Sequence, residues 1–453
     1  MKKKMSLLLL LVMVVSSILS GCGQSETQKK EGEPTSKTEN GGKETETDEK
    51  VKITFQTWNP SEGDAIDEII AAFEEKYPNI EVEFVYMPYT DHVQDLKIDM
   101  ASGAGADVYG MQTGAQYLEF RDYQVDLTAF ADKSWGDNWQ GKYIDFCMDL
   151  LNEEDRFYGF PLGLTYAGFA WADVNYLNKY NLKVPTSLSE LKEAATVLRK
   201  NNEFPMAIGA KDDWINIDVW MSIANDINSG KLYSAIEGET EFTDADLVKS
   251  FEIWQSLFKD GVFQDGALGV SMYTDVTDLF EKEGSVPMYM NGSWAAGFYM
   301  ATDEQVHEVM NSEGADHDVF LIDWNDDGKV SPITASVDVV LCMNSNTEHQ
   351  EEAWTFINYM LHEGQDVLIN KYLQYSPSRT DLELNVEGLS EDGNKSLSYI
   401  VDQSRANIAG YREMTYPELK QTISDVLKEL ALDTCTPEEA GQKVEKASKA
   451  QAR

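Results

Sequence analysis

The chain has 453 residues, and its 79 acidic residues against 37 lysines and arginines give a formal net charge of −42. So acidic a surface repels nucleic acid, which we exclude as a partner, and it argues mildly against polyanionic glycans. Residues 51–453 exceed the ~250 to 300 residues that one hydrophobic core serves, so we expect two lobes.

The chain begins MKKKMSLLLLLVMVVSSILSGC. Three lysines, an apolar run shorter than the ~20 residues of a membrane span, and small residues after it predict an export signal over residues 1–21. The four residues at the end of the apolar run, Leu19-Ser20-Gly21-Cys22, resemble the lipobox of bacterial lipoproteins. This resemblance implies cleavage before Cys22 and lipidation of its thiol. An ordinary cleavage site is the alternative. Cleavage leaves 34 basic against 79 acidic residues, a net charge of −45.

Residues 22–50 are expected to form the lipidated cysteine and a disordered tether. Residues 23–50 contain no aliphatic or aromatic side chain, so they cannot bury enough apolar surface to offset the entropy of ordering. More than one acyl chain gives stable membrane anchoring. We therefore expect a lipid-anchored protein on the outer face of the cell membrane of a single-membrane bacterium.

The first folded segments alternate between strand and helix patterns. Strands are expected at 51–58, 80–86 and 107–111, with helices between them, which predicts parallel βαβ units. Ligands of such sheets bind beyond the carboxyl ends of strands, where Trp58, Gln112 and Thr113 fall. The other elements expected are helices near 89–102, 188–200, 214–227, 244–260, 275–283, 347–361 and 417–430, and strands at 286–290, 318–322 and 337–343.

Four segments in this order resemble the carbohydrate-binding solute-binding proteins of ABC importers, typified by maltose-binding protein. They are IIAAFEEKYPNIEVEFVY (69–86), FYGFPLGLTYAGFAWADVNYL (157–177), FEKEGSVPMYMNGSWAAG (280–297) and AWTFINYMLHEGQDVLINKYLQYSPSR (353–379). The resemblance implies an α/β, two-lobed periplasmic-binding-protein fold, with a ligand cleft between lobes and hinge crossovers. Lobe one would contain residues 51–163 and 317–362, and lobe two residues 164–316 and 363–453.

The same resemblance implies the function. The protein would capture a sugar or oligosaccharide outside the cell and deliver it to the permease subunits of an ABC transporter, as a monomer and without catalysis. A secreted carbohydrate-active enzyme, a surface adhesin and a binding protein for another solute are the alternatives. The sugar itself is not readable from the sequence.

Trp294 follows the turn MNGSW, in which Asn291-Gly292 predicts a break because both residues tolerate positive φ. It matches the family's sugar-stacking tryptophan, since an indole offers a broad apolar face to the C–H groups of a sugar. A core position is the alternative. Asn291 could offer its amide to ligand hydroxyls, although turn geometry explains it equally well.

Other candidates for the ligand site come from aromatic or polar residues in unusual places. Asp213-Trp214 is a second aromatic-plus-acid pair, and Trp58 is expected at the cleft. Tyr166 follows a crossover, where hinge packing and ligand contact are both open. Asp338 interrupts an apolar run, and burying a carboxylate is costly unless it is paired. We therefore assign it a ligand or hinge role.

A calcium loop is a weaker candidate. Asp323, Asn325 and Asp327 match positions 1, 3 and 5 of such a loop, but Thr334 stands where a bidentate glutamate is required. A plain Asp-Gly turn is therefore preferred. The sequence has no paired histidine motif and no Walker A motif, so we expect neither metal nor cofactor. The three cysteines after Cys22 are interpreted as buried apolar residues, with any pairing among them left open.

Overall fold

The computed structural model describes residues 50–58, 63–282, 285–297, 317–387, 389 and 391–453, all within one unit, Glu49–Arg453. The expected export signal, Cys22 and residues 23–49 of the expected tether lie outside the described residues. Within the described part of the chain, no helix combines the length and the apolar character needed to cross a bilayer.

Most of the long helices lie where apolar periodicity predicts them. The helices expected at 89–102 and 188–200 have those bounds. The α-helices are α1 (Gly63–Lys76), α2 (Tyr89–Ser102), α3 (Ala115–Glu119), α4 (Thr128–Trp135), α5 (Asp145–Leu151), α6 (Val174–Lys179), α7 (Leu188–Lys200), α8 (Asp213–Ile236), α9 (Ala245–Lys259), α11 (Gln350–Tyr359), α12 (Glu391–Ala406), α13 (Pro417–Ala431) and α14 (Pro437–Ala450).

Short helical turns of other types connect these elements. The helix expected near 275–283 is present as two consecutive π-helical segments, η4 and η5, which begin three residues earlier. The segments are η1 (Arg121–Tyr123), η2 (Trp139–Lys142), η3 (Ala267–Gly269), η4 (Met272–Val276), η5 (Asp278–Lys282), η6 (Ser293–Ala295), η7 (Met360–Gly364) and η8 (Val367–Lys371).

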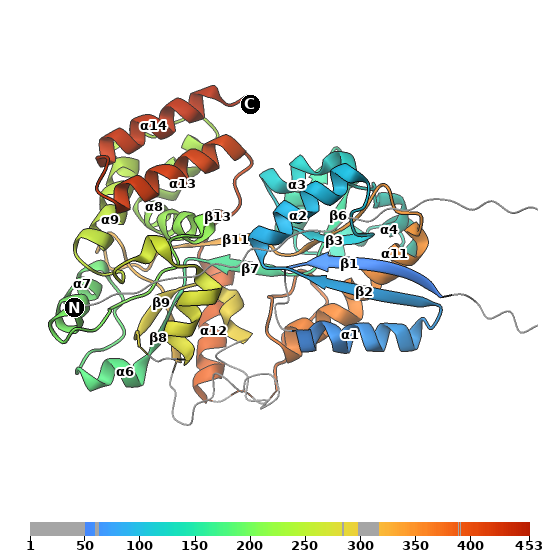
Figure 1. The fold of residues 1–453 in the computed structure, drawn as a ribbon, viewed down its shortest axis with the longest axis horizontal. Helices are drawn as coiled ribbons and strands as arrows, with labels where there is room; N and C mark the ends of the chain where they lie inside the picture. Colours follow the sequence, from blue (N-terminus) through green and yellow to red (C-terminus); the bar gives the residue numbers. More distant parts are fainter. Residues whose placement is uncertain (1–49, 59–62, 283–284, 298–316, 388, 390) are drawn as a thin grey trace, which may run out of the picture. The chain divides into compact units, whose positions relative to one another are not determined.

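A five-stranded sheet with the order β2-β1-β3-β12-β6 contains the first strands of the chain (Figure 1). Its strands are β1 (Val51–Thr57), β2 (Ile80–Tyr86), β3 (Val108–Met111), β6 (Gly159–Pro161) and β12 (Val340–Met343). β1 pairs in parallel with β2 and β3, as the sequence predicts. Right-handed crossovers from β1 to β2 and from β2 to β3 run in opposite directions, so α1 and α2 lie on opposite faces of the sheet.

Two three-stranded sheets and a short hairpin complete the described strands. The first sheet has the order β13-β11-β7, and the second has the order β10-β8-β9. Their strands are β7 (Leu164–Ala167), β8 (Ala170–Asp173), β9 (Met288–Met290), β10 (His317–Phe320), β11 (Ile333–Val337) and β13 (Ile408–Tyr411), and the hairpin is β4 (Asn152–Glu153) with β5 (Arg156–Phe157).

The strand expected at 337–343 is in fact two strands of different sheets. β11 pairs with β7 and β13, whereas β12 pairs with β3 and β6, and Asp338 lies between them. The apolar run is continuous because both strands are buried. At the start of segment 317–362, expected in lobe one, β10 pairs with β8 from the segment expected in lobe two. The lobe boundaries stay a prediction.

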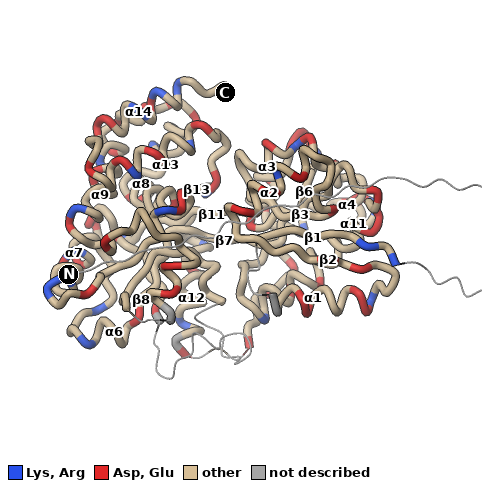
Figure 2. The backbone as a smooth tube through the Cα atoms, in the orientation of Figure 1, with Lys and Arg blue, Asp and Glu red and all other residues tan. Residues whose placement is uncertain are grey.

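The surface and the interior follow the composition. Figure 2 shows aspartate and glutamate on almost every labelled helix, with fewer lysines and arginines among them. Cys147, Cys342 and Cys435 are buried and unbridged, which confirms their interpretation as apolar core residues. Burial raises the pKa of the thiols of Cys147 and Cys342, so they stay protonated.

Candidate functional site

Trp294 lies directly after β9, in the short turn η6. The expected positive φ is absent, because Gly292 has φ −108° and ψ −171°. Gly292 is needed for another reason: a Cβ there would lie 2.1 Å from a carbon of the Trp294 ring. The glycine in MNGSW therefore lets the indole lie flat against the backbone that precedes it.

Three aromatic side chains form what we call the aromatic platform: Trp214, Tyr273 and Trp294. Trp214 stacks on Tyr273, with ring centroids 5.7 Å apart and an interplanar angle of 17°. Trp294 meets Trp214 edge-on, at 5.9 Å and 64°. The two indoles are half-buried and Tyr273 is 48% exposed, so apolar ring surface remains open to solvent. α8, η4 and η6 each contribute one ring.

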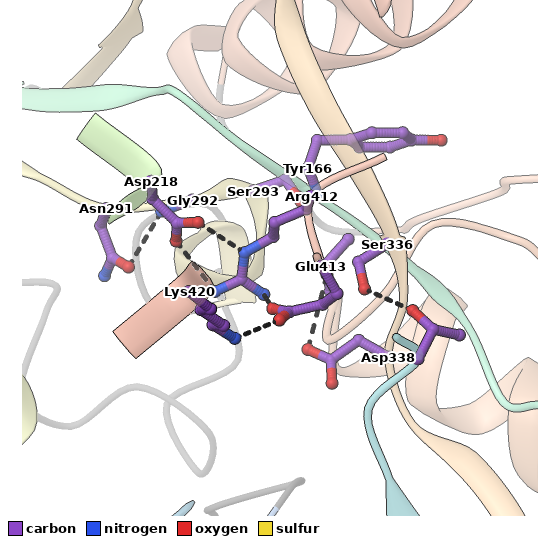
Figure 3. A network of polar contacts seen from close by, with 12 residues as sticks. Tyr166, Asp218, Asn291, Gly292, Ser293, Ser336, Asp338, Arg412, Glu413 and Lys420 are labelled. Carbon is purple, nitrogen blue, oxygen red and sulfur yellow. Dashed lines mark hydrogen bonds and ion pairs between the residues drawn. The ribbon is translucent and has the colours of Figure 1, made fainter. Parts of the chain in front are cut away.

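A buried arginine supports the platform. The guanidinium carbon of Arg412 lies 4.7 Å from the ring centroid of Trp294 and 5.9 Å from that of Trp214. Its Nε and Nη2 donate to the two carboxylate oxygens of Asp218, at 2.9 and 2.8 Å (Figure 3). This bidentate pair fixes the guanidinium plane, and a desolvated cation beside an indole adds cation–π attraction.

Two further charged residues, Glu413 and Lys420, extend the Arg412–Asp218 pair. We call these four residues the charged network. Glu413 is buried and accepts a 2.6 Å hydrogen bond from Lys420, as Figure 3 shows. Burial opposes the charge of Glu413, but Lys420 and Arg412 together hold the pKa of its carboxyl below the ordinary value. Burial likewise opposes the charge of Arg412, but Asp218 and Glu413 raise the pKa of its guanidinium. Burial raises the pKa of the Asp218 carboxyl, and Arg412 opposes that rise.

Asp338 adds a fifth ionisable group beside this network. Its Oδ2 accepts from Thr165 Oγ1 at 3.4 Å, whereas its buried Oδ1 has no hydrogen-bond partner among the described residues. Burial raises the pKa of Asp338 to about 6, and the nearby Arg412 opposes that rise. A carboxylate in this state favours a further hydrogen-bond donor.

A second aromatic group comes from the five-stranded sheet. Trp58, at the end of β1, lies 5.2 Å from Tyr89 and 5.2 Å from His92 between ring centroids. Tyr89 is within electrostatic reach of Arg412 and Asp338, and Tyr273 is within reach of the same two groups. Both sets of aromatic rings are thus within electrostatic reach of Arg412 and Asp338.

Gln112 and Thr113, which directly follow β3, are buried. Thr113 Oγ1 lies 3.3 Å from Ser336 Oγ of β11. The side chain of Gln112 lies near Asp338 and helps to lower the pKa of its carboxyl. These contacts join the five-stranded sheet to the β13-β11-β7 sheet. The ligand roles of both residues stay predictions.

Two other predicted residues, Tyr166 and Asn291, are engaged in internal contacts. The Tyr166 ring points away from the charged network in Figure 3, and its hydroxyl hydrogen-bonds toward Ser404. Asn291 Nδ2 donates to Tyr289 Oη at 3.0 Å, and its Oδ1 accepts from the Gly292 amide. Their surroundings favour structural roles.

Asp213 lies beside Trp214 in sequence but forms an ion pair with Lys428 of α13. In the calcium candidate, the oxygens of Asp323, Asn325 and Asp327 accept backbone amides of their own turn. Among the residues that the structure describes, no three His, Cys, Asp or Glu side chains converge as metal ligands. The loop has the hydrogen bonding of an Asp-Gly turn.

Sequence reasoning missed Asp218, Arg412, Glu413, Tyr89 and Tyr273. The adjacent charges in NIAGYREMTYP interrupt an aromatic stretch, and Asp218 interrupts the apolar helix segment INIDVW. Both are the kind of signal that drew attention to Asp338. The partners are 194 positions apart in the chain, so no local pattern joins them.

These contacts place aromatic rings and buried charges between separate sheets, which is the architecture of a solute-binding protein. Residues 57–367 match the family described as bacterial extracellular solute-binding protein. This match spans more than half of the chain, so the chain belongs to that family. The family expected from the sequence is confirmed.

Individual relatives are distant. An "uncharacterized ABC transporter extracellular-binding protein" of Pyrococcus horikoshii is 24% identical over 310 residues, which are 66% of each chain. The galactooligosaccharide-binding protein of Bacillus subtilis is 24% identical over 309 residues, 65% of this chain and 64% of that protein.

A solved structure from work on xylan utilization by Caldanaerobius polysaccharolyticus has a TM-score of 0.74 at 19% identity. The superposition covers 88% of this chain and 100% of that one. At this identity the likeness concerns the fold, and it confirms the predicted two-lobed solute-binding fold.

Proposed function

We propose that this protein is the substrate-binding lipoprotein of an ABC importer. It captures a sugar or oligosaccharide outside the cell and delivers it to the permease subunits. The observation that carries the proposal is the aromatic platform: partly exposed rings of Trp214, Tyr273 and Trp294 beside the buried Arg412–Asp218 pair. A sugar has apolar C–H faces and a rim of hydroxyls, and this arrangement complements both.

Similarity supports the same solute class. The Bacillus subtilis relative is named for binding galactooligosaccharides, and the solved structure comes from work on xylan utilization. We assign ligand contact to Trp58, Trp214, Trp294 and Asp338, with Gln112 and Thr113 at the junction behind them. No catalysis and no cofactor are part of the proposal.

The finer assignments belong to the same proposal. The lipid on Cys22 would hold the protein at the outer face of the membrane, and residues 23–50 would give the folded part reach toward a permease. Lobe closure would bring Trp58 and the platform onto opposite sides of one ligand, in a monomer. Radiolabelled palmitate incorporation, lost in Cys22→Ala, tests the anchor.

A thermal-shift screen tests the function. The secreted chain carrying Cys22→Ala is screened against galacto-, xylo- and malto-oligosaccharides, with amino acids and peptides as controls. A ligand at 100-fold excess over Kd stabilises the native state by about 2.7 kcal/mol, which is a visible shift. A shift with one glycan class and no released reducing ends supports a receptor. A shift with an amino acid or peptide alone would replace the sugar by another solute.

A further inference from the structure

Two buried polar atoms beside the charged network lack partners within the described residues. They are Oδ1 of Asp338 and the hydroxyl of Tyr375. Both residues are 5% exposed. Buried polar atoms are nearly always hydrogen-bonded, so an unpartnered acceptor and an unpartnered donor in one place require an explanation.

Strand pairing places the two residues on one face of a sheet. Val337 of β11 pairs with Leu164 of β7, so Asp338 lies opposite Gly163, and its amide donates to the Gly163 carbonyl at 2.9 Å. On the other edge, Leu164 forms an antiparallel bridge with Ser376. The residues one step along this bridge, Thr165 and Tyr375, therefore lie opposite each other. Cross-strand neighbours project to the same face.

Gly163 adjoins both residues: the Asp338 amide bonds to its carbonyl, and the Tyr375 side chain packs against its Cα. A Cβ at Gly163 would lie 2.3 Å from Cβ and 2.4 Å from Cγ of Tyr375. The tyrosine ring thus begins where a side chain at 163 would stand, next to Asp338. Thr165, on the same face, already donates to the other carboxylate oxygen of Asp338. The negative charge of Asp338 also helps to raise the pKa of Tyr375, after burial itself.

We propose that Asp338 and Tyr375 together bind one hydroxyl group of the solute. This hydroxyl donates its hydrogen to Asp338 Oδ1 and accepts a hydrogen from Tyr375 Oη. A solute carboxylate has no hydrogen for Asp338 and is repelled by its charge, so the pair selects a neutral, hydroxyl-bearing solute over an acid-substituted one. A solute ammonium group has hydrogens for both Asp338 Oδ1 and Tyr375 Oη, so it is the alternative partner that the test separates from a hydroxyl. This inference rests on the proposed sugar-binding function and names the solute class within it.

The test compares Tyr375 with Tyr143, because both are buried and both have a hydroxyl that is unpartnered among the described residues. No contact joins Tyr143 to Asp338, so it serves as the control. Tyr375→Phe and the control Tyr143→Phe are made in the secreted full chain carrying Cys22→Ala. Calorimetry measures Kd for neutral galacto-, xylo- and malto-oligosaccharides, for cationic chitosan oligomers and for anionic oligogalacturonates.

We expect a neutral oligosaccharide to bind, and the anionic probe to bind at least about tenfold more weakly because its carboxylate leaves Asp338 Oδ1 without a donor. The cationic probe should bind no more tightly than the neutral one. Tyr375→Phe should weaken neutral binding about five- to tenfold, and Tyr143→Phe should leave it unchanged. Asp338→Asn should narrow the preference for neutral over anionic probes. Melting temperatures show that each variant is folded.

Three results would overturn the inference. If Tyr375→Phe binds the neutral probe like wild type, the pair holds only a water molecule. If chitosan oligomers bind more tightly than neutral ones and lose this in Asp338→Asn, the partner is an ammonium group. If wild type binds no saccharide at all, the proposed function fails first and the inference fails with it.

Discussion

Two groups of tryptophans in this protein share one side-chain type but differ in how their indole nitrogens are used. Trp135, Trp139 and Trp354 surround Phe160, with centroid distances of 4.8, 5.2 and 6.0 Å. Each of these indole N–H groups donates a hydrogen bond of 2.7 to 2.8 Å. In the aromatic platform, the buried Nε1 of Trp294 has no described partner.

The difference separates stability from recognition. In the first group every indole N–H is hydrogen-bonded and the rings pack around Phe160, so these contacts stabilise the fold. The platform keeps ring faces open and relies on the buried Arg412–Asp218 pair to hold them in place. An exposed aromatic with a fixed support is the better candidate for binding, because little side-chain entropy remains to be lost.

The largest expected effect lies in the first group. Trp139→Ala should lower the free energy of unfolding by about 5 kcal/mol, because it leaves a large cavity and an unpaired Asp132. Chemical denaturation measures this loss. Ligand affinity of the folded fraction should be unchanged. A variant that unfolds normally but binds poorly would contradict the division between the two groups.

Arg412→Met should destabilise the protein by about 4 kcal/mol, because Asp218 stays buried without its cation and Glu413 keeps only Lys420. Unlike Trp139→Ala, it should also weaken ligand binding, since the platform loses its support. The double variant Arg412→Met with Asp218→Asn should recover part of the stability and none of the binding. Denaturation and calorimetry on the same samples would show whether the two losses separate.

Asp338 should make the free energy of unfolding depend on pH. Its pKa of about 6 lies above the ~3.9 of an unfolded aspartate. The stability contributed by its protonated form is therefore present below about pH 4 and is lost as pH rises through 6, by up to about 3 kcal/mol.

The free energy of unfolding, measured from pH 4 to 7, should fall in wild type relative to Asp338→Asn. Arg412 and Glu413 face this carboxyl, with Thr165 and Gln112 as neutral neighbours. A difference between the two proteins that does not change with pH would show that Asp338 is ionised throughout. Ligand affinity should rise over the same range, because a solute hydroxyl donates best to the carboxylate.

Substitution of Trp294 should have the smallest effect of these variants, and it tests the binding role of the aromatic platform directly. Trp294→Ala should weaken sugar binding by about 1 to 3 kcal/mol through lost aromatic burial, with little change in stability. Trp220→Phe is the control, because Trp220 lies in the same region but is fully buried and bonded to Ser250. Equal Kd values for Trp294→Ala and wild type would assign Trp294 to the core.

Local patterns predicted the fold well where they are long and periodic. The helix at 188–200 begins with Ser187 as its N-cap, whose hydroxyl accepts from the Glu190 amide. Helices α12 and α14 were missed, although α14 has a complete capping box at Thr436. The split of 337–343 was also missed, because a buried apolar run looks the same in one strand or two.

The candidate site was predicted only in part. Trp214 and Trp294 were named separately, and the structure brings them into contact. Their common support, Arg412, lies 118 positions beyond Trp294 in the sequence, and a charged residue in a loop carries no mark of burial. Asn291 and Asp213 were named for residue type, but the polar atoms of Asn291 bond to its neighbours Tyr289 and Gly292, and Asp213 pairs with the distant Lys428.

The sequence by itself determined the acidic surface, the parallel βαβ start, most helix positions and the family, because these depend on composition and on contacts between near neighbours. Only the tertiary structure decided which charges are buried, which tryptophan faces stay open, and that Asp338 and Tyr375 flank Gly163. Those properties depend on pairing between distant strands. Burial then changes the energy of each charge and each unpartnered hydrogen-bonding group far more than local sequence does.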